Sequence, residues 1–204
     1  MVGGELTPVW LSDAYRHGIF PWPLGGEDEP VTWWSPDPRA IVELHEFRVS
    51  RRLRRTCRTG PFEVTCNRAF DRVIAGCATA GDRQGATWIT PRMRAAYSRL
   101  HALGRAHSVE VWSAGRLAGG LYGVAQDGLF AAESMFHVVR DASKVALVRL
   151  VAHLAARGYR LLDIQQWTPH LGRFGAGEIP RAVYLRRLAA ALEVPVTFGD
   201  RLEE

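Results

Sequence analysis

The order of the periodic segments after residue 90 constrains the fold of this chain more than any other feature of its sequence. Thr90 and Pro91 form an N-cap and N1 pair, and apolar residues then recur at helical spacing until Gly104 provides a stop. Three strand-like segments follow, and a hairpin-type turn at residues 126–128 separates the last two. These segments cover residues 107–113, 116–125 and 129–136. We therefore expect one amphipathic helix followed by an antiparallel meander.

A second helix, another strand and a final helix complete this order. Asp141 begins a helical pattern that ends before Gly158. The segment YRLLDIQ, residues 159–165, is typical of a buried strand, and Pro180 opens a helix that extends through Leu192. The order predicts an α+β or α/β body in which helices cover a mixed sheet.

This order is similar to that of acyltransferases with an acetyltransferase-like (GNAT-like) fold, and we predict the α+β class with a mixed sheet flanked by helices. Such enzymes usually bind the pyrophosphate of coenzyme A with a Q/R-x-x-G-x-G/A turn. The nearest match is RLAGGL at residues 116–121, in which the last position is wrong. Coenzyme A is therefore not the expected donor.

The N-terminal part has a different composition. Residues 18–38 contain five prolines and three tryptophans, which disfavours regular structure. We predict a small loop-rich N-terminal domain over residues 1–38 and a catalytic domain over residues 39–204. The clustered aromatic residues of the N-terminal domain either pack against the catalytic domain or offer a stacking surface for bases.

Composition and cysteine spacing limit the class of protein. With 204 residues, 47% of them hydrophobic and 23% charged, the chain is typical of one globular domain with a small appendage. No stretch approaches the roughly 18 consecutive apolar residues of a membrane span, and the N-terminus lacks the regions of a signal peptide. The expected location is the cytoplasm. The three cysteines lack C-x₂-C spacing, so we expect reduced thiols and no zinc site.

The positive charge is concentrated in one segment. The formal net charge is +5, and residues 48–58, RVSRRLRRTCR, contain six arginines. Arginine can direct two donors at one phosphate, so this segment indicates a polyanionic partner such as nucleic acid. A solvated basic face is the alternative.

A polar pair lies in the predicted strand at residues 159–165. Positions i and i+2 point to the same face of a strand, so Asp163 and Gln165 should lie side by side while Leu162 and Ile164 pack on the other face. Burying such groups without partners costs on the order of 1–3 kcal/mol each. The pair is therefore either a hydrogen-bonded structural feature or part of a functional site.

Several phrases, taken together and in order, carry a resemblance to one family. They are GIFPW, WWSPDPR, ATWIT, AYSRLHALGRAHSVEVW, GGLYGVAQ, ESMF, ASKVAL, LLDIQ and GAGEIPR. On these phrases the chain resembles the leucyl/phenylalanyl-tRNA–protein transferases from about residue 3 to residue 181. The N-terminus begins just before GGELT, which makes it shorter than in longer relatives.

The resemblance implies an activity and its partners. Such enzymes move leucine or phenylalanine from charged tRNA to proteins that begin with arginine or lysine, which marks those proteins for N-end-rule degradation. The implied partners are leucyl-tRNA, phenylalanyl-tRNA and these acceptor proteins, the expected state is a monomer, and no cofactor or metal is expected. The acidic segment 23–30 is expected to affect acceptor access.

The resemblance also implies catalytic residues. Asp163 and Gln165 match the family's D-x-Q motif at the reaction centre, and Glu133 matches an acidic residue of the same cleft. We hypothesise that the Gln165 carbonyl accepts a hydrogen bond from the attacking amine while Asp163 orients it. Glu133 then holds Gln165 or binds the guanidinium of the acceptor, unless it forms only a salt bridge at a strand end.

Further residues are assigned to binding. Trp22 and Trp88 match positions that flank the 3′-terminal adenosine, with packing as the alternative. The predicted walls of the aminoacyl pocket, each of which can instead be ordinary core, are Leu121, Phe130, Met135 and Ile164. The predicted contacts to the tRNA backbone are Arg48, Arg51, Arg52, Arg54, Arg55 and Lys144. His107 and His170 are interpreted as structural.

Two other functions stay open from the sequence. One is a related tRNA-dependent acyltransferase with a different amine acceptor. The other is a tRNA-binding module without catalysis, which the presence of Asp163, Gln165 and Glu133 disfavours.

Overall fold

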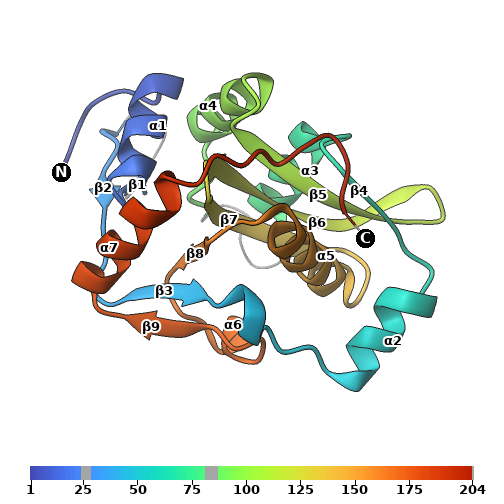
Figure 1. Cartoon of the computed structure of the whole chain (residues 1–204). Helices are drawn as coiled ribbons and strands as arrows, with labels where there is room; N and C mark the ends of the chain where they lie inside the picture. The colour runs from blue at the N-terminus through green and yellow to red at the C-terminus, as the bar shows by residue number, and fades with distance from the viewer. Residues whose placement is uncertain (24–28, 81–86, 204) are drawn as a thin grey trace.

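A mixed seven-stranded sheet forms the centre of this computed structural model, which describes residues 1–23, 29–80 and 87–203 (Figure 1). The strand order is β4-β5-β6-β7-β8-β3-β9. The strands are β3 (Arg39–Val42), β4 (Glu63–Cys66), β5 (Ala106–Ser113), β6 (Arg116–Gln126), β7 (Leu129–His137), β8 (Leu161–Gln165) and β9 (Gly177–Ile179). Only the β7–β8 pair is parallel among these neighbours, so the predicted mixed sheet is confirmed.

The predicted meander is also confirmed. Strands β5, β6 and β7 are consecutive antiparallel neighbours, with Leu121 opposite both Val109 and Met135. The hairpin turn at residue 127 places Asp127 in a left-handed conformation with φ of 50°. Each of these three strands agrees with its predicted range to within one residue, whereas β8 begins two residues later than predicted.

Helices cover both faces of the sheet. The longer ones are α1 (Pro8–Arg16), α2 (Arg51–Thr59), α3 (Phe70–Thr79), α4 (Pro91–Ala102), α5 (Ala142–Arg157) and α7 (Arg181–Leu192), and the short ones are η1 (Leu44–Glu46) and α6 (Pro169–Gly172). Buried residues of α1, α3 and α4 share one core cluster with Tyr122 and Val124 of β6, whereas α5 packs with Leu121 on the opposite face. The alternation of the sheet residues thus separates two apolar layers.

The ends of these helices follow from local sequence. Thr90 accepts a hydrogen bond from the Met93 N–H, as expected of an N-cap, and helix α4 ends before Gly104. At the other end of α5, Gly158 has φ of 87°, which favours glycine because it has no Cβ atom. The predicted helices at 90–104, 141–158 and 180–192 are therefore confirmed.

The N-terminal part contains more regular structure than its composition predicts. Residues 8–16 form α1, capped by Thr7, and strands β1 (Phe20–Pro21) and β2 (Trp33–Trp34) form a two-stranded sheet. The buried Tyr15 and Trp33 belong to the core cluster of α3 and α4. Most of the acidic segment 23–30 lies outside the described residues. The division at residue 38 stays a prediction.

Within the described part of the chain, no helix is long and apolar enough to cross a membrane.

Candidate active site

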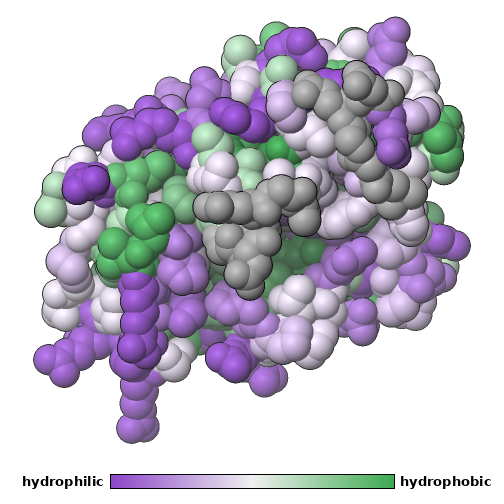
Figure 2. Space-filling view, turned by 180° about the vertical axis from the view of Figure 1, so that it is seen from behind, coloured by the Kyte–Doolittle hydropathy of each residue, from purple (hydrophilic) through white to green (hydrophobic). Residues whose placement is uncertain are grey.

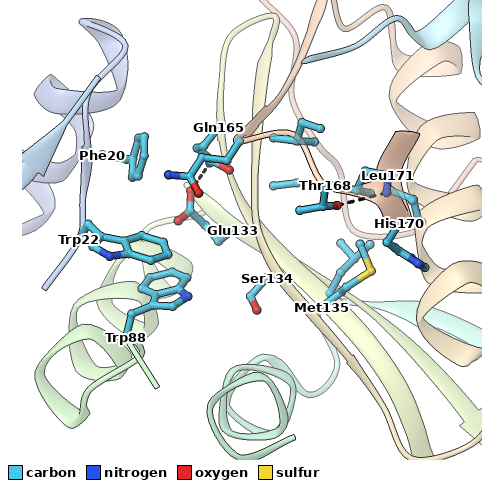
Figure 3. Close-up of a pocket in the computed structure, with 15 residues that line it drawn as sticks. Phe20, Trp22, Trp88, Glu133, Ser134, Met135, Gln165, Thr168, His170 and Leu171 are labelled. Carbon is cyan, nitrogen blue, oxygen red and sulfur yellow. Dashed lines mark hydrogen bonds between the residues drawn. The ribbon is translucent and has the colours of Figure 1, made fainter. Parts of the chain in front are cut away.

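A cavity of about 410 Å³ opens beside the carboxyl end of β8. Its lining comes from both ends of the chain, since the N-terminal part, β7, β8 and the loop to α6 all contribute (Figure 3). The lining residues are Phe20, Trp22, Trp88, Leu121, Ala132, Glu133, Ser134, Met135, Leu147, Ile164, Gln165, Gln166, Thr168, His170 and Leu171. Figure 2 shows apolar side chains at the bottom of a hollow in a largely hydrophilic face.

Three of the four predicted pocket residues line this cavity. Leu121, Met135 and Ile164 contribute to its apolar wall. Phe130 is absent from the described lining, because its fully buried ring packs against Tyr159 and Phe198 in the core. Phe130 shares one core cluster with Leu121 and Ile164, so it lies on the same side of the sheet without lining the cavity.

Gln165 and Glu133 meet on one wall of the cavity (Figure 3). The Gln165 Nε2 donates a hydrogen bond to Glu133 Oε1 at 3.1 Å. Gln165 has a left-handed backbone with φ of 57°, which interrupts the alternation of β8, so both Ile164 and Gln165 reach the cavity. This bond uses the Gln165 amide nitrogen and leaves the carboxamide oxygen available to accept a hydrogen bond from another group.

Asp163 lies behind the cavity wall. Its Oδ1 accepts a hydrogen bond from the Gln165 backbone N–H at 2.9 Å, and its side chain is 1% exposed. Asp163 is not among the described residues that line the cavity. The expected side-by-side arrangement is therefore replaced by one in which the carboxylate supports the backbone of Gln165.

Arg39 is the main partner of Asp163. Arg39 Nε donates to Oδ1 at 2.9 Å and Nη2 donates to Oδ2 at 2.5 Å, which makes a bidentate ion pair with both side chains 1% exposed. Tyr184 of α7 donates its hydroxyl to Oδ2 at 2.8 Å. Sequence reasoning missed Arg39, although an arginine at the start of the apolar strand RAIV is a signal that a buried anion is nearby.

Arg39 also connects this cluster to the N-terminal part. Its Nη1 donates to the Gly18 carbonyl at 2.9 Å, and its guanidinium lies 5.0 Å from the Phe20 ring centroid and 4.4 Å from that of Tyr184. Because Phe20 lines the cavity, the same arginine supports two of its walls.

Two tyrosines contact Glu133 from behind. The Tyr97 hydroxyl donates to Glu133 Oε2 at 3.1 Å, and the hydroxyls of Tyr15 and Tyr97 lie 2.7 Å apart. Burial raises the pKa of the Glu133 carboxyl to about 7, and hydrogen bonds from Tyr15 and Tyr97 partly offset that rise. The sequence offered no separate signal for these tyrosines.

Trp22 and Trp88 stand at one side of the cavity as a stacked pair. Their ring centroids are 5.1 Å apart with an interplanar angle of 20°. A planar base does not fit between rings at this separation, so the pair offers its outer faces.

The predicted phosphate-binding residues fall into two groups. Arg52 makes a bidentate contact to Asp141 at 2.7 and 3.1 Å, and Lys144 lies 2.8 Å from the same carboxylate. This pairing holds the pKa of the Asp141 carboxyl well below its usual range. Arg48, Arg51, Arg54 and Arg55 are exposed.

Helix α2 lies at one corner of the molecule (Figure 1), and hydrophilic side chains project from the same corner in Figure 2. Leu53 is the buried residue of this helix and anchors it to the α5 side of the core. The basic helix is thus attached to the body mainly by one apolar side chain and by the Arg52–Asp141 pair.

Other candidate features carry no cofactor signal. In the described part of the chain, no group of three or more His, Cys, Asp or Glu residues is arranged to hold a metal. RLAGGL lies within strand β6 rather than in a turn before a helix. His107 is buried against Phe198, and His170 lies beside Phe174 at the edge of the cavity.

Comparisons with known proteins identify close relatives. The sequence profile described as leucyl/phenylalanyl-tRNA protein transferase matches residues 41–189, and the profile of that family's N-terminal domain matches residues 4–37. A leucyl/phenylalanyl-tRNA–protein transferase of Chromohalobacter salexigens is 54% identical over 195 residues, which cover 96% of this chain and 75% of that protein. The enzyme of the same name from Nitratidesulfovibrio vulgaris is 53% identical over 97% of this chain and 84% of its own length.

Solved structures with a related shape are more distant. An aminoglycoside acetyltransferase from a soil metagenome has a TM-score of 0.40 and 18% identity, covering 52% of this chain and 80% of its own. A GCN5-related N-acetyltransferase from Kribbella flavida has a TM-score of 0.39 and 12% identity, covering 80% of this chain and 58% of its own.

Proposed function

Because this chain belongs to the leucyl/phenylalanyl-tRNA–protein transferase family and is an aminoacyltransferase, we propose that it moves leucine or phenylalanine from charged tRNA to an N-terminal arginine or lysine. The observation that carries the proposal is a largely apolar cavity with a polar Glu133–Gln165 pair in its wall. Its volume of about 410 Å³ lies within the range of small-molecule sites, roughly 300–1,000 Å³.

The apolar wall binds the aminoacyl side chain. Leu121, Met135 and Ile164 come from three strands of one sheet, and Leu147 of α5 adds a fourth surface. Methionine and leucine repack easily, which suits two side chains of different shape. Phe130 supports this wall from the core rather than touching the substrate.

The tryptophan pair binds the 3′-terminal adenosine. An adenine that stacks on an outer face of the Trp22–Trp88 pair gains roughly 1–3 kcal/mol. The ribose ester then lies between this pair and Glu133, since all three residues line one cavity.

The chemistry requires a positioned amine and a proton acceptor, because the aminoacyl ester is already activated. The acceptor's α-ammonium has an ordinary pKa of about 7.7–8.0 and must lose a proton before attack. We assign the orientation of the amine to Gln165 Oε1, with Asp163 acting through the Gln165 backbone. Glu133 takes the proton, directly or through a water molecule, since its pKa of about 7 is matched to that of the amine.

The transfer step replaces the ester bond to the ribose with an amide bond to the acceptor. The amine nitrogen forms a bond to the ester carbonyl carbon, and the tetrahedral intermediate collapses with cleavage of the bond to the ribose oxygen. The proton held by Glu133 passes to that oxygen, and the restored carboxylate takes the second proton from the nitrogen as the amide forms and releases it to solvent. The products are a peptide one residue longer and a deacylated tRNA.

The tRNA backbone binds along the basic surface of α2. The exposed Arg51, Arg54 and Arg55, together with Arg48 before the helix, are the proposed phosphate contacts. Arg52 and Lys144 are paired with Asp141, so their proposed contribution is to hold the helix in place and to share any phosphate contact with that carboxylate. We further propose a monomeric protein of the cytoplasm, with residues 1–38 as its small N-terminal domain.

The test is a transfer assay. The purified protein is incubated with leucyl-tRNA or phenylalanyl-tRNA and a peptide that begins with arginine, and the product mass and N-terminal sequence are determined. Addition of one leucine or phenylalanine is expected, with no addition to the acetylated peptide. No addition despite tRNA binding would refute the proposed acceptor and favour another amine acceptor.

A further inference from the structure

Two buried tyrosines behind Glu133 have no role in the reaction described so far. We propose that Tyr97, oriented by Tyr15, is a positioning residue that keeps the Glu133 carboxylate ionised and directed at Gln165 while the acceptor amine loses its proton. This inference rests on the proposed function, because it concerns the group that receives that proton.

The direction of the hydrogen bonds can be assigned from the geometry. Glu133 Oε1 accepts from Gln165 Nε2 at 3.1 Å, and Oε2 accepts from the Tyr97 hydroxyl at 3.1 Å. Because the Tyr97 proton points to Glu133, the 2.7 Å contact between the two phenol oxygens has Tyr15 as its donor. Both hydroxyl protons therefore point toward the carboxylate, which favours its charged form.

Both tyrosines keep their hydroxyl protons. Tyr15 is 1% exposed and Tyr97 is 0% exposed. Burial, followed by the charge of Glu133, raises the pKa of both phenols well above the ordinary value. Neither hydroxyl can therefore act as the base, and both stay protonated over the working pH range.

The charged groups around Glu133 do not remove the need for these donors. Asp163 of β8 raises the pKa of the Glu133 carboxyl, Arg39 of β3 lowers it, and burial raises it most. Arg39 is itself paired with Asp163, so it offers little net charge to Glu133. Without the phenol donors, a buried carboxyl would retain its proton at neutral pH and could not receive another.

The pair also couples the N-terminal part to the chemistry. Tyr15 lies on α1 and Tyr97 on α4, and the Tyr97 ring is held edge-on by Tyr122 of β6 at 5.4 Å between centroids. Tyr15 and Glu133 are about 120 positions apart in the sequence. The ionisation of Glu133 on β7 thus depends in part on a residue of helix α1.

The first test measures Glu133 directly. The full-length protein, labelled with ¹³C at glutamate side-chain carboxyls, is titrated by NMR, and the Glu133 resonance is assigned from its loss in Glu133→Gln. Wild type should titrate at about pH 7. Tyr97→Phe and Tyr15→Phe should each raise the midpoint by about one pH unit, because hydrogen bonds from both tyrosines lower the pKa of the Glu133 carboxyl.

Tyr159→Phe is the matched control. Tyr159 is also buried, but its hydroxyl has no hydrogen-bond partner among the described residues, so its removal should leave the Glu133 midpoint unchanged. Tyr15→Phe keeps the Tyr97–Glu133 bond and gives a second reading if Tyr97→Phe does not fold. Wild-type or lower midpoints in the folded tyrosine variants would overturn the proposal.

The second test measures transfer. In Tyr97→Phe the acidic limb of the kcat profile should move to higher pH, with about a tenfold loss at pH 6 and little change in KM for charged tRNA. A uniform loss at every pH would overturn the proposal in favour of a purely structural role. A shifted NMR midpoint together with no transfer to arginine peptides supports the tyrosine assignment and refutes the proposed acceptor.

Discussion

The buried Arg39–Asp163 ion pair supports the catalytic wall, and its disruption gives the sharpest test of that view. Replacing Asp163 with Asn leaves the Arg39 guanidinium without a counter-charge at a site where both side chains are 1% exposed. Breaking one partner of a buried pair typically costs about 3–5 kcal/mol of unfolding free energy. We expect Asp163→Asn and Arg39→Met each to lose this amount.

The two substitutions should not be additive. The double variant leaves no uncompensated charge, so it should be about as stable as either single variant, with a coupling energy of about 3–5 kcal/mol. Urea denaturation followed by tryptophan fluorescence measures all four proteins. Transfer activity should fall at least tenfold in each single variant, because the Gln165 N–H faces a neutral and weaker acceptor in Asp163→Asn, and its acceptor loses the support of Arg39 in Arg39→Met.

An exposed pair of similar geometry is the control. Arg187 and Glu43 form a bidentate contact at 2.5 and 2.7 Å, but their side chains are 34% and 30% exposed. The same double-mutant cycle there should give a coupling energy of about 0–1 kcal/mol. Additive losses at Arg39 and Asp163, or a coupling energy no larger than at Arg187 and Glu43, would refute the reasoning.

Three further predictions concern pH, stacking and charge. Glu133 has a folded-state pKa of about 7, above its ordinary value of 4.5, so wild-type stability falls as the pH rises from 4.5 to 7. The stability of Glu133→Gln relative to wild type should therefore increase by on the order of 2 kcal/mol between pH 5 and pH 8. Thermal melts that give the same stability difference between the two proteins at both pH values would contradict this. Trp22→Ala should raise the KM for charged tRNA about tenfold in steady-state kinetics, with little change in kcat or in melting temperature. The control is Trp34→Ala, because Trp34 is another partly exposed tryptophan of the N-terminal part. Charge reversal of Arg54 and Arg55 should weaken tRNA binding and lower its salt dependence by about one unit of slope per lost phosphate contact, whereas reversal of Arg186 on α7 should not; equal effects at both places would argue against α2 as the binding surface.

Part of the site follows from residues that are close in sequence. The D-x-Q spacing brings Asp163 and Gln165 into one strand, and the phrase ESMF places Glu133 and Met135 on another. The parallel β7–β8 pairing then brings the two strands together. The alternative that Asp163 and Gln165 form a hydrogen-bonded pair at a strand end agrees with the structure, in which Asp163 accepts from the Gln165 N–H. Strand periodicity does not show that the Asp163 side chain is buried behind the cavity wall.

The remaining parts of the site depend on contacts that the sequence does not announce. Arg52 and Asp141 are 89 positions apart, and their pairing divides an arginine-rich segment into free and paired residues. The left-handed backbone of Gln165 turns its side chain into the cavity against the alternation of its strand. The helix α1 was also missed, although Thr7 and Pro8 form the same kind of N-cap and N1 pair as Thr90 and Pro91.

The sequence by itself determined the order of elements and the family, because helical and strand periodicity, caps and turns are set by neighbouring residues. The tertiary structure alone decided which buried groups meet. Arg39 lies 124 positions from Asp163, and Tyr15 lies 82 positions from Tyr97. Their contacts exist because β3 returns beside β8 and α1 packs with α4 in one core, an arrangement governed by long-range burial rather than by local propensity.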